Sequence, residues 1–353
     1  MKIAHVVYGM TIGGIETMLL NIANEQVKSQ DLSIVVINDL IEPSLTAKLD
    51  SRINLIQIKR PVGSKSPYYL LKLNYTLLRI APDIIHLHCS SMIRFLYFPL
   101  FRKKTCITQH SLLDSRYVKH ISSFEHRYAI SKSVQENIKL TTGKDSEVVM
   151  NGIPMNSIET KKSFLESKFF QVVILGRLEH QIKGQHIAIQ ALRILRDRGI
   201  NQVRLSLIGE GESESYLKQL VIDEGLSETV TFLGLKSQDY IFSHLHTYDL
   251  LIQPSLYEGF GLTVAEAMAA KVPVLVSEND GPLEIIDYGK YGYSFKKNDP
   301  EDCARMIEQI MADPHKDKLV EEAYQRVKEN YDVIVTANTY IEKYKEILSN
   351  RNL

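Results

Sequence analysis

The sequence predicts an α/β protein built from two doubly wound domains, each a parallel sheet with helices on both faces. Short runs rich in β-branched residues alternate with longer segments of helical periodicity along the whole chain. The strand-like runs are continuously apolar, which is typical of strands buried on both faces. A length of 353 residues favours two cores over one. Because ligands bind outside the carboxyl ends of parallel strands, we expect the two domains to face each other across a cleft.

The first predicted domain covers residues 1–160. Met18, Leu19, Ile22, Ala23 and Val27 recur at helical spacing after its first strand. Its expected strands are 3–7, 32–37, 54–58, 83–88, 105–108, 127–130 and 147–150.

The second predicted domain covers residues 161–333, after a polar segment at 155–168 that we interpret as a linker. Its expected strands are 169–175, 203–208, 229–233, 249–253 and 272–276. Its expected helices are 185–198, 213–224, 237–245, 262–270 and 301–311. Two polar helices, 316–329 and 334–349, close the chain, and we expect the segment from about 334 to 353 to pack back onto the first domain.

Composition narrows the class of protein. Three widely spaced cysteines (Cys89, Cys106 and Cys303) argue against a disulfide framework or a zinc site and fit a reducing compartment. No apolar run approaches the length of a membrane span. Net charge is zero, but residues 1–160 carry 19 Lys and Arg against 13 Asp and Glu, and the remainder carries 23 against 29. This difference predicts that the first domain meets an anionic partner, and an evenly charged surface is the alternative interpretation. The net charge of zero and the absence of a basic-aromatic module disfavour a nucleic-acid binder.

The strongest local signal is a pair of glutamates, Glu258 and Glu266, separated by seven residues. Between them a turn with Gly259 and Gly261 leads into an expected helix that begins near Leu262. Backbone N–H groups and the helix dipole at such a start favour a phosphate. Because Glu258 precedes the helix and Glu266 lies inside it, the two can address different parts of one extended ligand. A capping acid and a solvated surface acid are the alternative interpretation.

A second signal is a pair of cations where another strand ends. Arg177 follows Gly176, and Lys183 precedes Gly184. Arg offers a fork of donors and Lys a point charge, which together suit a diphosphate. Two ordinary surface cations are the alternative.

Two weaker signals lie in the first domain. Gly13 and Gly14 follow the first strand and would let a ligand approach the backbone, although the spacing is not that of a dinucleotide fingerprint and a plain turn is the alternative. His110 lies just after the strand at 105–108, at an edge expected to face the cleft. His86 and His88 alternate at the end of another strand, where they can simply pack.

Together these motifs resemble the retaining glycosyltransferases of family 4, which have the GT-B fold of two Rossmann-like domains. The resemblance extends over essentially the whole chain, and the order and spacing of its pieces are specific. The motifs are Gly13-Gly14-Ile15-Glu16, Thr108-Gln109-His110, Ala129-Ile130-Ser131, Asn151-Gly152-Ile153, Gly176-Arg177-Leu178, Lys183-Gly184, Ile208-Gly209-Glu210-Gly211, Phe232-Leu233-Gly234 and Glu258 through Glu266.

The resemblance implies roles for five side chains. Arg177 and Lys183 would neutralise the diphosphate of a nucleoside-diphosphate-sugar donor, and Glu266 would hold its ribose. Glu258 would contact hydroxyls of the transferred sugar, and His110 would approach that sugar near the reacting carbon. The catalytic set is therefore expected to be His110, Arg177, Lys183 and Glu258.

Further contacts implied by the resemblance come from backbone and loop positions. Backbone N–H groups in the turn before the expected helix 262–270 would cap phosphate or sugar oxygens. Gly14, next to Gly13, would border the phosphates or the acceptor. The segment 233–236 would lie near the base. These substrate-binding positions are Gly13, Gly14, Leu235, Phe260, Gly261 and Leu262. No metal or cofactor is expected, because Arg and Lys supply the positive charge.

The implied reaction moves a hexosyl or N-acetylhexosaminyl group from a nucleoside-diphosphate-sugar, with UDP as the expected nucleotide, to a glycan or lipid-linked acceptor with retention of configuration. Bacterial surface polysaccharide or capsule synthesis is the expected setting, with the protein in the cytoplasm or peripheral to the inner face of the plasma membrane. A sugar-nucleotide 2-epimerase of the same fold and an inactive nucleotide-sugar-binding scaffold are the alternatives.

Two further features of the sequence are a departure from the family pattern and a stretch with two interpretations. The family often has Gly-Gly where this chain has Gly281 and Pro282, and proline removes one backbone N–H from a possible donor set. The stretch from Arg94 to Lys104 mixes aromatic residues with cations. It predicts either a buried helix with a basic end or a patch for a membrane surface near a lipid-linked acceptor.

Overall fold

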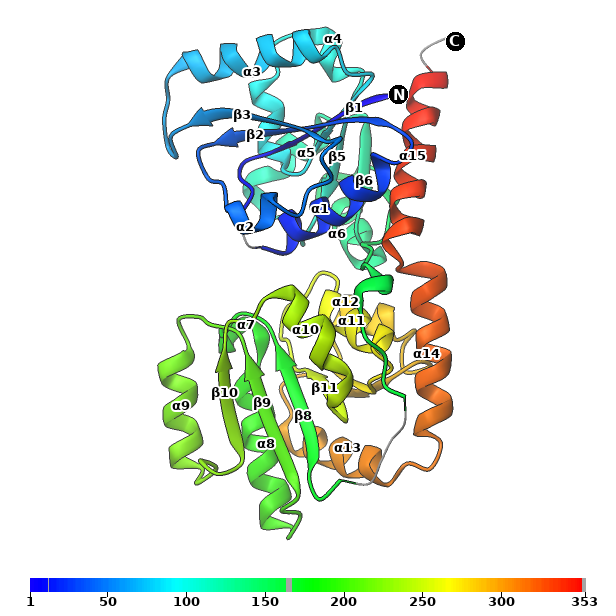
Figure 1. Ribbon diagram of the computed structural model, residues 1–353. Coiled ribbons are helices and arrows are strands. Elements are labelled where there is room, and N and C mark those ends of the chain that lie inside the picture. Colours follow the sequence, from blue (N-terminus) through cyan, green and yellow to red (C-terminus); the bar gives the residue numbers. More distant parts are fainter. Residues whose placement is uncertain (12, 163–166, 351–353) are drawn as a thin grey trace. The chain divides into compact units, whose positions relative to one another are not determined.

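The computed structural model describes residues 1–11, 13–162 and 167–350, which form two compact units (Figure 1). Unit 1 comprises Met1–Ile153 and Asp332–Leu353, and unit 2 comprises Pro154–Tyr331. Residues 163–166 of the expected linker and 351–353 of the expected last helix lie outside the described residues.

The division between the units falls after Ile153, whereas the sequence placed it after residue 160. Backbone hydrogen bonds explain the difference. Glu159 N–H donates to the Phe242 carbonyl, and Lys161 N–H donates to the Ala270 carbonyl. These bonds attach the polar segment after Ile153 to unit 2.

Unit 1 contains a seven-stranded parallel sheet with the order β3-β2-β1-β4-β5-β6-β7. The order reverses between β1 and β4, which makes this pair the crossover point of a doubly wound sheet. The strands are β1 (Lys2–Val7), β2 (Asp31–Asn38), β3 (Asn54–Arg60), β4 (Ile84–Leu87), β5 (Thr105–Gln109), β6 (His126–Ala129) and β7 (Glu147–Val148).

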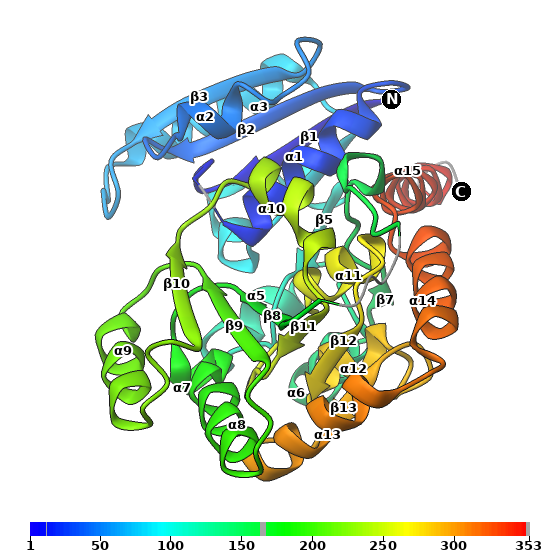
Figure 2. The same cartoon turned by 60° about the horizontal axis from the view of Figure 1, so that its bottom comes forward.

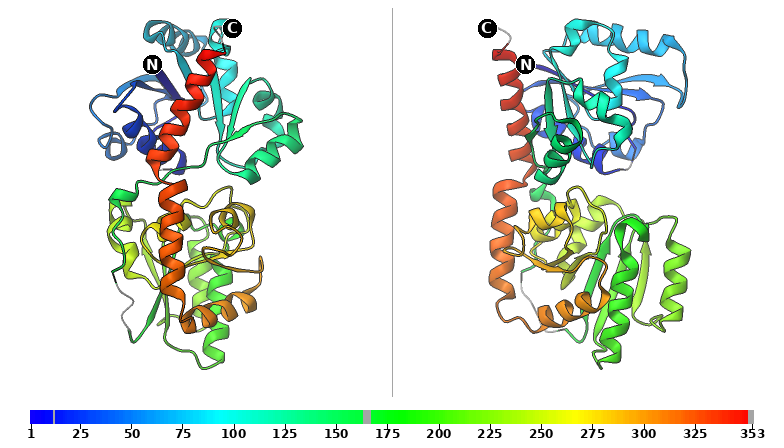
Figure 3. Two further views of the ribbon diagram at one scale, coloured as in Figure 1. Left: turned by 90° about the vertical axis from the view of Figure 1, so that its right-hand side faces the viewer. Right: turned by 180° about the vertical axis from the view of Figure 1, so that it is seen from behind.

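Helices cover both faces of this sheet because its strands are apolar on both sides. On one face α1 and α15 pack against each other and share a core with β1 and β2 (Figures 1 and 3). On the other face α3, η1 and α5 enclose a second core. The helices of unit 1 are α1 (Gly14–Gln26), α2 (Pro43–Thr46), α3 (Pro67–Ile80), η1 (Ser90–Phe95), α4 (Pro99–Arg102), η2 (Ser115–Tyr117), α5 (Val118–Ser122), α6 (Lys132–Thr142) and α15 (Val333–Ser349).

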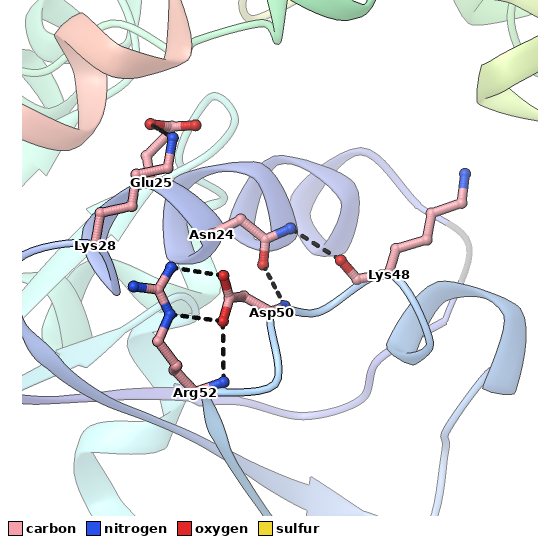
Figure 4. Close-up of polar contacts among 6 residues, drawn as sticks. All are labelled: Asn24, Glu25, Lys28, Lys48, Asp50 and Arg52. Carbon is pink, nitrogen blue, oxygen red and sulfur yellow. Dashed lines mark hydrogen bonds and ion pairs between the residues drawn. The ribbon is translucent and has the colours of Figure 1, made fainter.

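Polar contacts fasten α1 to the loop that precedes β3 (Figure 4). The Asn24 amide donates to the Lys48 carbonyl at 2.9 Å and accepts from Asp50 N–H at 2.8 Å. Arg52 forms a two-pronged ion pair with the Asp50 carboxylate. These contacts link the later part of α1 to the loop, and Gly13 and Gly14 lie at the beginning of the same helix.

Unit 2 contains a six-stranded parallel sheet with the order β10-β9-β8-β11-β12-β13 (Figure 2). Its crossover point lies between β8 and β11. The strands are β8 (Phe170–Leu175), β9 (Val203–Ile208), β10 (Val230–Gly234), β11 (Leu250–Gln253), β12 (Val274–Ser277) and β13 (Tyr293–Phe295).

One face of this sheet packs against α8, α9 and α13, and α11 lies between the sheet and α14. The helices of unit 2 are η3 (Met155–Ser157), α7 (His180–Lys183), α8 (Gln185–Asp197), α9 (Glu214–Asp223), α10 (Gln238–His244), η4 (Leu245–Thr247), α11 (Leu262–Ala269), α12 (Asp280–Ile285), α13 (Pro300–Ala312) and α14 (Lys316–Asn330). No helix in the described parts of the chain combines the length and apolar character needed to cross a bilayer.

Gly152, at the end of the first segment of unit 1 (Met1–Ile153), packs closely against α15. An added Cβ would lie 2.5 Å from Thr336 Oγ1 and 2.6 Å from Val333 Cα. Ile153 then forms a parallel bridge with Asp332.

We therefore predict that Gly152→Ala lowers the free energy of unfolding by about 1–3 kcal/mol, the usual cost of overpacking. Denaturant unfolding measures this change. Asn338→Ala, at an exposed position of the same helix, is the control. Equal midpoints for the two variants would show that α15 yields at this contact.

Candidate functional site

The predicted site residues divide into two groups, one in each unit. In unit 2 they follow the carboxyl ends of parallel strands, and in unit 1 they follow β1 and β5. Each group includes residues that follow a strand at the crossover point of its sheet, which is where doubly wound sheets bind ligands. The unit 2 group is Arg177, Lys183, Leu235, Glu258, Phe260, Gly261, Leu262 and Glu266, and the unit 1 group is Gly13, Gly14 and His110.

The loops after β8 and β11 touch at Gly184. This residue has a φ of +66°, and a Cβ there would overlap the carbonyl oxygen of Pro254. Only glycine fits both conditions. The Ile182 carbonyl also accepts hydrogen bonds from the N–H groups of Leu256 and Tyr257, at 2.8 and 3.3 Å. The two loops therefore hold a fixed relative position.

This contact brings Lys183 and Glu258 together although they are 75 residues apart in the sequence. Lys183 Nζ lies 2.6 Å from Glu258 Oε2, and the two side chains are 27% and 19% exposed. The Gln253 amide donates to Ser255 Oγ at 2.7 Å and faces Glu258 at 3.4 Å. Thr263 in α11 donates to Gln253 Oε1 at 2.7 Å. Glu258 is thus oriented from two sides and remains open to solvent.

Arg177 is exposed directly after β8. Its backbone carbonyl accepts a hydrogen bond from Gln185 Nε2 at 2.8 Å, which fixes the chain at this point. Within residues 1–11, 13–162 and 167–350, no ion pair engages its guanidinium group. Its planar set of N–H donors is consequently available for an anionic ligand.

The turn before α11 depends on two glycines. Gly261, the N-cap of α11, has a φ of +103°. A Cβ on Gly281 would lie 2.6 Å from Gly259 C and Phe260 N, so α12 can approach the turn only with glycine there. Phe260 is buried, and Leu262 begins the helix. Because the first N–H groups of a helix lack intrahelical acceptors, they can bind an anionic ligand.

Pro282 lies in the first turn of α12, where a backbone N–H would have no intrahelical partner. The departure from Gly-Gly therefore costs the helix no hydrogen bond. Its ring instead approaches Gly261, with Cγ 3.3 Å from the position of an added Cβ.

Glu266 lies inside α11 and is partly exposed. Desolvation by the surrounding protein raises the pKa of its carboxyl to about 8. A carboxyl group with such a pKa can donate as well as accept hydrogen bonds near neutral pH. Leu235, directly after β10, is 56% exposed and presents an apolar surface at the same edge of the sheet.

In unit 1, Gly13 caps α1 with extended backbone and no side-chain hydrogen bond. A Cβ on Gly13 would meet the Glu16 carboxylate, whereas one on Gly14 would meet no described atom within 4 Å. The first turn of α1 is therefore open to a ligand at Gly14.

His110 follows β5 and is linked to buried histidines. Its Nε2 lies 3.1 Å from His88 Nδ1, and the two rings stack with centroids 5.4 Å apart. Desolvation lowers the pKa of His110 to about 4, so the ring is neutral at pH 7. A neutral imidazole at this position can offer a lone pair or a proton to a sugar hydroxyl.

Sequence profiles of two protein families match adjoining parts of this chain. The profile of glycosyltransferase family 4 matches residues 12–156, and that of the group 1 glycosyl transferases matches residues 156–330. The shared limit at residue 156 lies close to the division between the structural units.

Individual proteins show the same relationship. An uncharacterised glycosyltransferase of Methanocaldococcus jannaschii is 28% identical over 65% of this chain. The capsular polysaccharide biosynthesis glycosyltransferase CapM of Staphylococcus aureus is 28% identical over 54%. These alignments span 62% and 50% of the two relatives. The crystal structure of Anabaena HepE in complex with UDP-glucose superposes with a TM-score of 0.82, at 20% identity over 98% of this chain and 99% of that one.

Two parallel α/β domains with these neighbours define a GT-B protein, which confirms the predicted fold class. The chain belongs to the glycosyltransferases of family 4.

Several residues of this site could not be selected from the sequence. Gln253 and Thr263 orient Glu258 through contacts that only the fold creates. Gln26 in α1 lies deep in unit 1, and nothing in its sequence surroundings sets it apart. His88 did give a signal, its alternation with His86, but that pattern also fits packing.

The raised pKa of Glu266 predicts a pH-dependent stability. In the unfolded chain this carboxyl ionises near 4.5, whereas in the folded protein it keeps its proton up to about 8. Between these values the folded state binds more protons, so the free energy of unfolding falls as pH rises. Glu266→Gln should remove this part of the decline, as measured by melting temperatures at pH 5 and pH 8. Glu136→Gln, on the exposed surface, is the control. Parallel pH curves for the wild type and Glu266→Gln would contradict the assignment.

Proposed function

We propose that the protein is a glycosyltransferase that moves a hexosyl or N-acetylhexosaminyl group from a UDP-sugar to a glycan or lipid-linked acceptor. The observation that carries the proposal is the cluster at the carboxyl edge of the second sheet, where Lys183 and Glu258 meet beside the start of α11. The cations that would neutralise a diphosphate and the carboxyl groups that would bind hydroxyl groups therefore lie at the same edge of one sheet. The complex of HepE with UDP-glucose supports a sugar-nucleotide donor.

In this proposal Arg177 and Lys183 neutralise the diphosphate as the bond between the anomeric carbon and the diphosphate oxygen breaks. The acceptor hydroxyl oxygen forms the new glycosidic bond from the same face, and its proton passes to the leaving UDP. Configuration is then retained. Because two side-chain cations supply the charge, we propose that the reaction needs no metal ion.

The other proposed roles are those that the family resemblance implies, and the positions of the residues support them. Glu266, whose carboxyl can donate and accept, holds the ribose hydroxyls, and Leu235 lies near the base. N–H groups of Phe260, Gly261 and Leu262 cap phosphate or sugar oxygens. The open turn at Gly13 and Gly14 and the neutral imidazole of His110 serve the acceptor and the transferred sugar.

The two glutamates should be separable by experiment. Glu266→Gln should weaken the binding of UDP, because it alters the carboxyl that contacts ribose. Glu258→Gln should leave UDP binding unchanged and lower UDP-glucose turnover about 100-fold, the typical cost of losing a preorganised transition-state contact. Calorimetry with UDP and release of UDP from UDP-glucose in the presence of EDTA measure the two effects.

Glu278→Gln, an exposed acid of the same unit, is the matched control for this pair. Loss of UDP binding in Glu258→Gln would show that the roles are misassigned. A strict requirement for a metal ion would contradict the proposed charge neutralisation.

We further propose a cytoplasmic protein that works in surface polysaccharide synthesis and contacts the membrane peripherally through unit 1. The name of the relative CapM supports the pathway class. Support for the contact comes from the α3–α4 face, which we define by six exposed apolar side chains: Leu71, Tyr75, Leu78, Tyr97, Phe98 and Leu100. In contrast to these six side chains, Leu96 is buried. Residues 94–104 do not form the single helix that the sequence allowed, but include the end of η1 and all of α4.

The α3–α4 face combines apolar surface with positive charge. A groove of about 530 Å³ runs between α3 and the segment before α4, lined by five of these side chains and Asn74. Arg79, Arg94, Arg102 and Lys103 are exposed on the same segments. Residues 61–104 contain seven Lys or Arg and a single acid, Asp83. An apolar surface on segments that also carry several exposed cations suits an anionic lipid surface.

This proposal predicts selective binding to anionic vesicles. Each cation near such a surface contributes about 1 kcal/mol, so changing Arg94, Arg102 and Lys103 to Ser should reduce sedimentation with phosphatidylglycerol vesicles strongly. Changing Lys297, Lys318 and Lys328, which are exposed in unit 2, should leave it unaltered. Equal binding to neutral vesicles, or an unaltered Arg94 triple variant, would contradict the proposal. Self-association that Leu71→Ser abolishes would assign the face to a second copy of the chain instead.

A further inference from the structure

Four histidines gather where β1, β4 and β5 lie side by side in unit 1. His5 lies within β1, His86 within β4, and His88 and His110 come directly after β4 and β5. His5, His86 and His88 are fully buried or nearly so. The cluster thus crosses the crossover point of the first sheet and reaches its carboxyl edge at His110.

Three of these rings form a continuous chain of hydrogen bonds that ends on Gln26 in α1. His110 Nε2 lies 3.1 Å from His88 Nδ1, and His88 Nε2 lies 2.9 Å from His5 Nδ1. His5 Nε2 lies 2.8 Å from Gln26 Oε1. His86 belongs to a separate branch, with its two nitrogens on the Tyr344 and Thr108 hydroxyls.

Ligand atoms of His5, His86 and His88 lie within 4.8 Å of one another, a spacing that could suit a metal ion. A metal would need a free lone pair from each ring. All six nitrogens instead face a protein partner, so the geometry favours a hydrogen-bond network.

Burial keeps this network neutral. Desolvation lowers the pKa of His5 to about 4 and holds the pKa of His88 well below its ordinary value. A neutral imidazole has one donor and one acceptor nitrogen, so each ring in the chain determines the tautomer of the next. Gln26 Oε1 can only accept, which requires a proton on His5 Nε2. That proton leaves His5 Nδ1 to accept from His88 Nε2, and His88 Nδ1 to accept from His110 Nε2.

We propose that Gln26, His5 and His88 are positioning residues that fix His110 as the Nε2–H tautomer and so present its Nδ1 lone pair to a hydroxyl group of the substrate. This inference rests on the proposed function, in which His110 contacts the transferred sugar or the acceptor. The chain ends on an amide, which takes up no proton. It therefore sets the direction of hydrogen bonding and does not conduct protons away.

The tautomers can be measured without any substrate. In protein labelled with ¹⁵N-histidine at pH 7, two-bond ¹H–¹⁵N spectra should show an unprotonated Nδ1 and a protonated Nε2 for His5, His88 and His110. Gln26→Met keeps the length of the side chain and removes the acceptor, so His110 should become a mixture of tautomers. Gln26→Glu restores an acceptor and should restore the single tautomer.

Kinetics then test the role. Gln26→Met should lower kcat for release of UDP from UDP-glucose about tenfold, the value of about one hydrogen bond, with KM unchanged, and Gln26→Glu should recover most of it. Tyr340→Phe, which removes a buried hydroxyl from the Thr108 branch, should change neither the tautomer nor kcat.

Two results would overturn the inference: a protonated Nδ1 on His110 in the wild type, or a Gln26→Met variant with wild-type tautomers and kcat. If the tautomers are as stated but the wild type turns over no sugar nucleotide, the proposed function fails and the structural role of Gln26 stands. If turnover is normal but His110 is a mixture of tautomers, the inference alone fails.

Discussion

The contact between Gly184 and Pro254 places the two loops at the crossover point of the second sheet, and the arrangement of the candidate donor site depends on it. A side chain at Gly184 would overlap the Pro254 carbonyl, so the loops after β8 and β11 can approach only with glycine there. The Ile182 carbonyl then accepts two backbone hydrogen bonds from the second loop. Lys183 and Glu258 come into contact as a consequence. The turn before α11 begins directly after Glu258 in the sequence.

The two sheets use the same topology for different chemistry. Both reverse their strand order at one point, β1 and β4 in the first sheet and β8 and β11 in the second. In the second sheet this point carries an ion pair that remains partly exposed. In the first sheet it carries neutral imidazoles whose charge is suppressed by burial. In the proposed function, the charged edge receives a sugar-nucleotide donor and the uncharged edge receives a hydroxyl group.

Much of the fold could be predicted because buried parallel strands consist of continuous runs of apolar residues in the sequence. The expected strands correspond to β1 through β12 within a residue or two. The strand β13 was not predicted, because Tyr293–Phe295 is too short to show a pattern of apolar residues. The unit boundary was placed too late because a polar segment can still be attached by backbone hydrogen bonds. The side chains that orient the site, such as Gln253 and Gln26, could not be found, since their partners are set by the sheet order rather than by neighbouring residues.

The central claim is that the carboxyl edge of the second sheet binds the diphosphate and ribose of a sugar nucleotide. A crystal structure of the protein with UDP tests it most directly. We expect phosphate oxygens within hydrogen-bond distance of the Arg177 guanidinium and Lys183 Nζ, and ribose hydroxyls on the Glu266 carboxyl. A diphosphate bound away from both cations, or a ribose on Glu258 in place of Glu266, would contradict it.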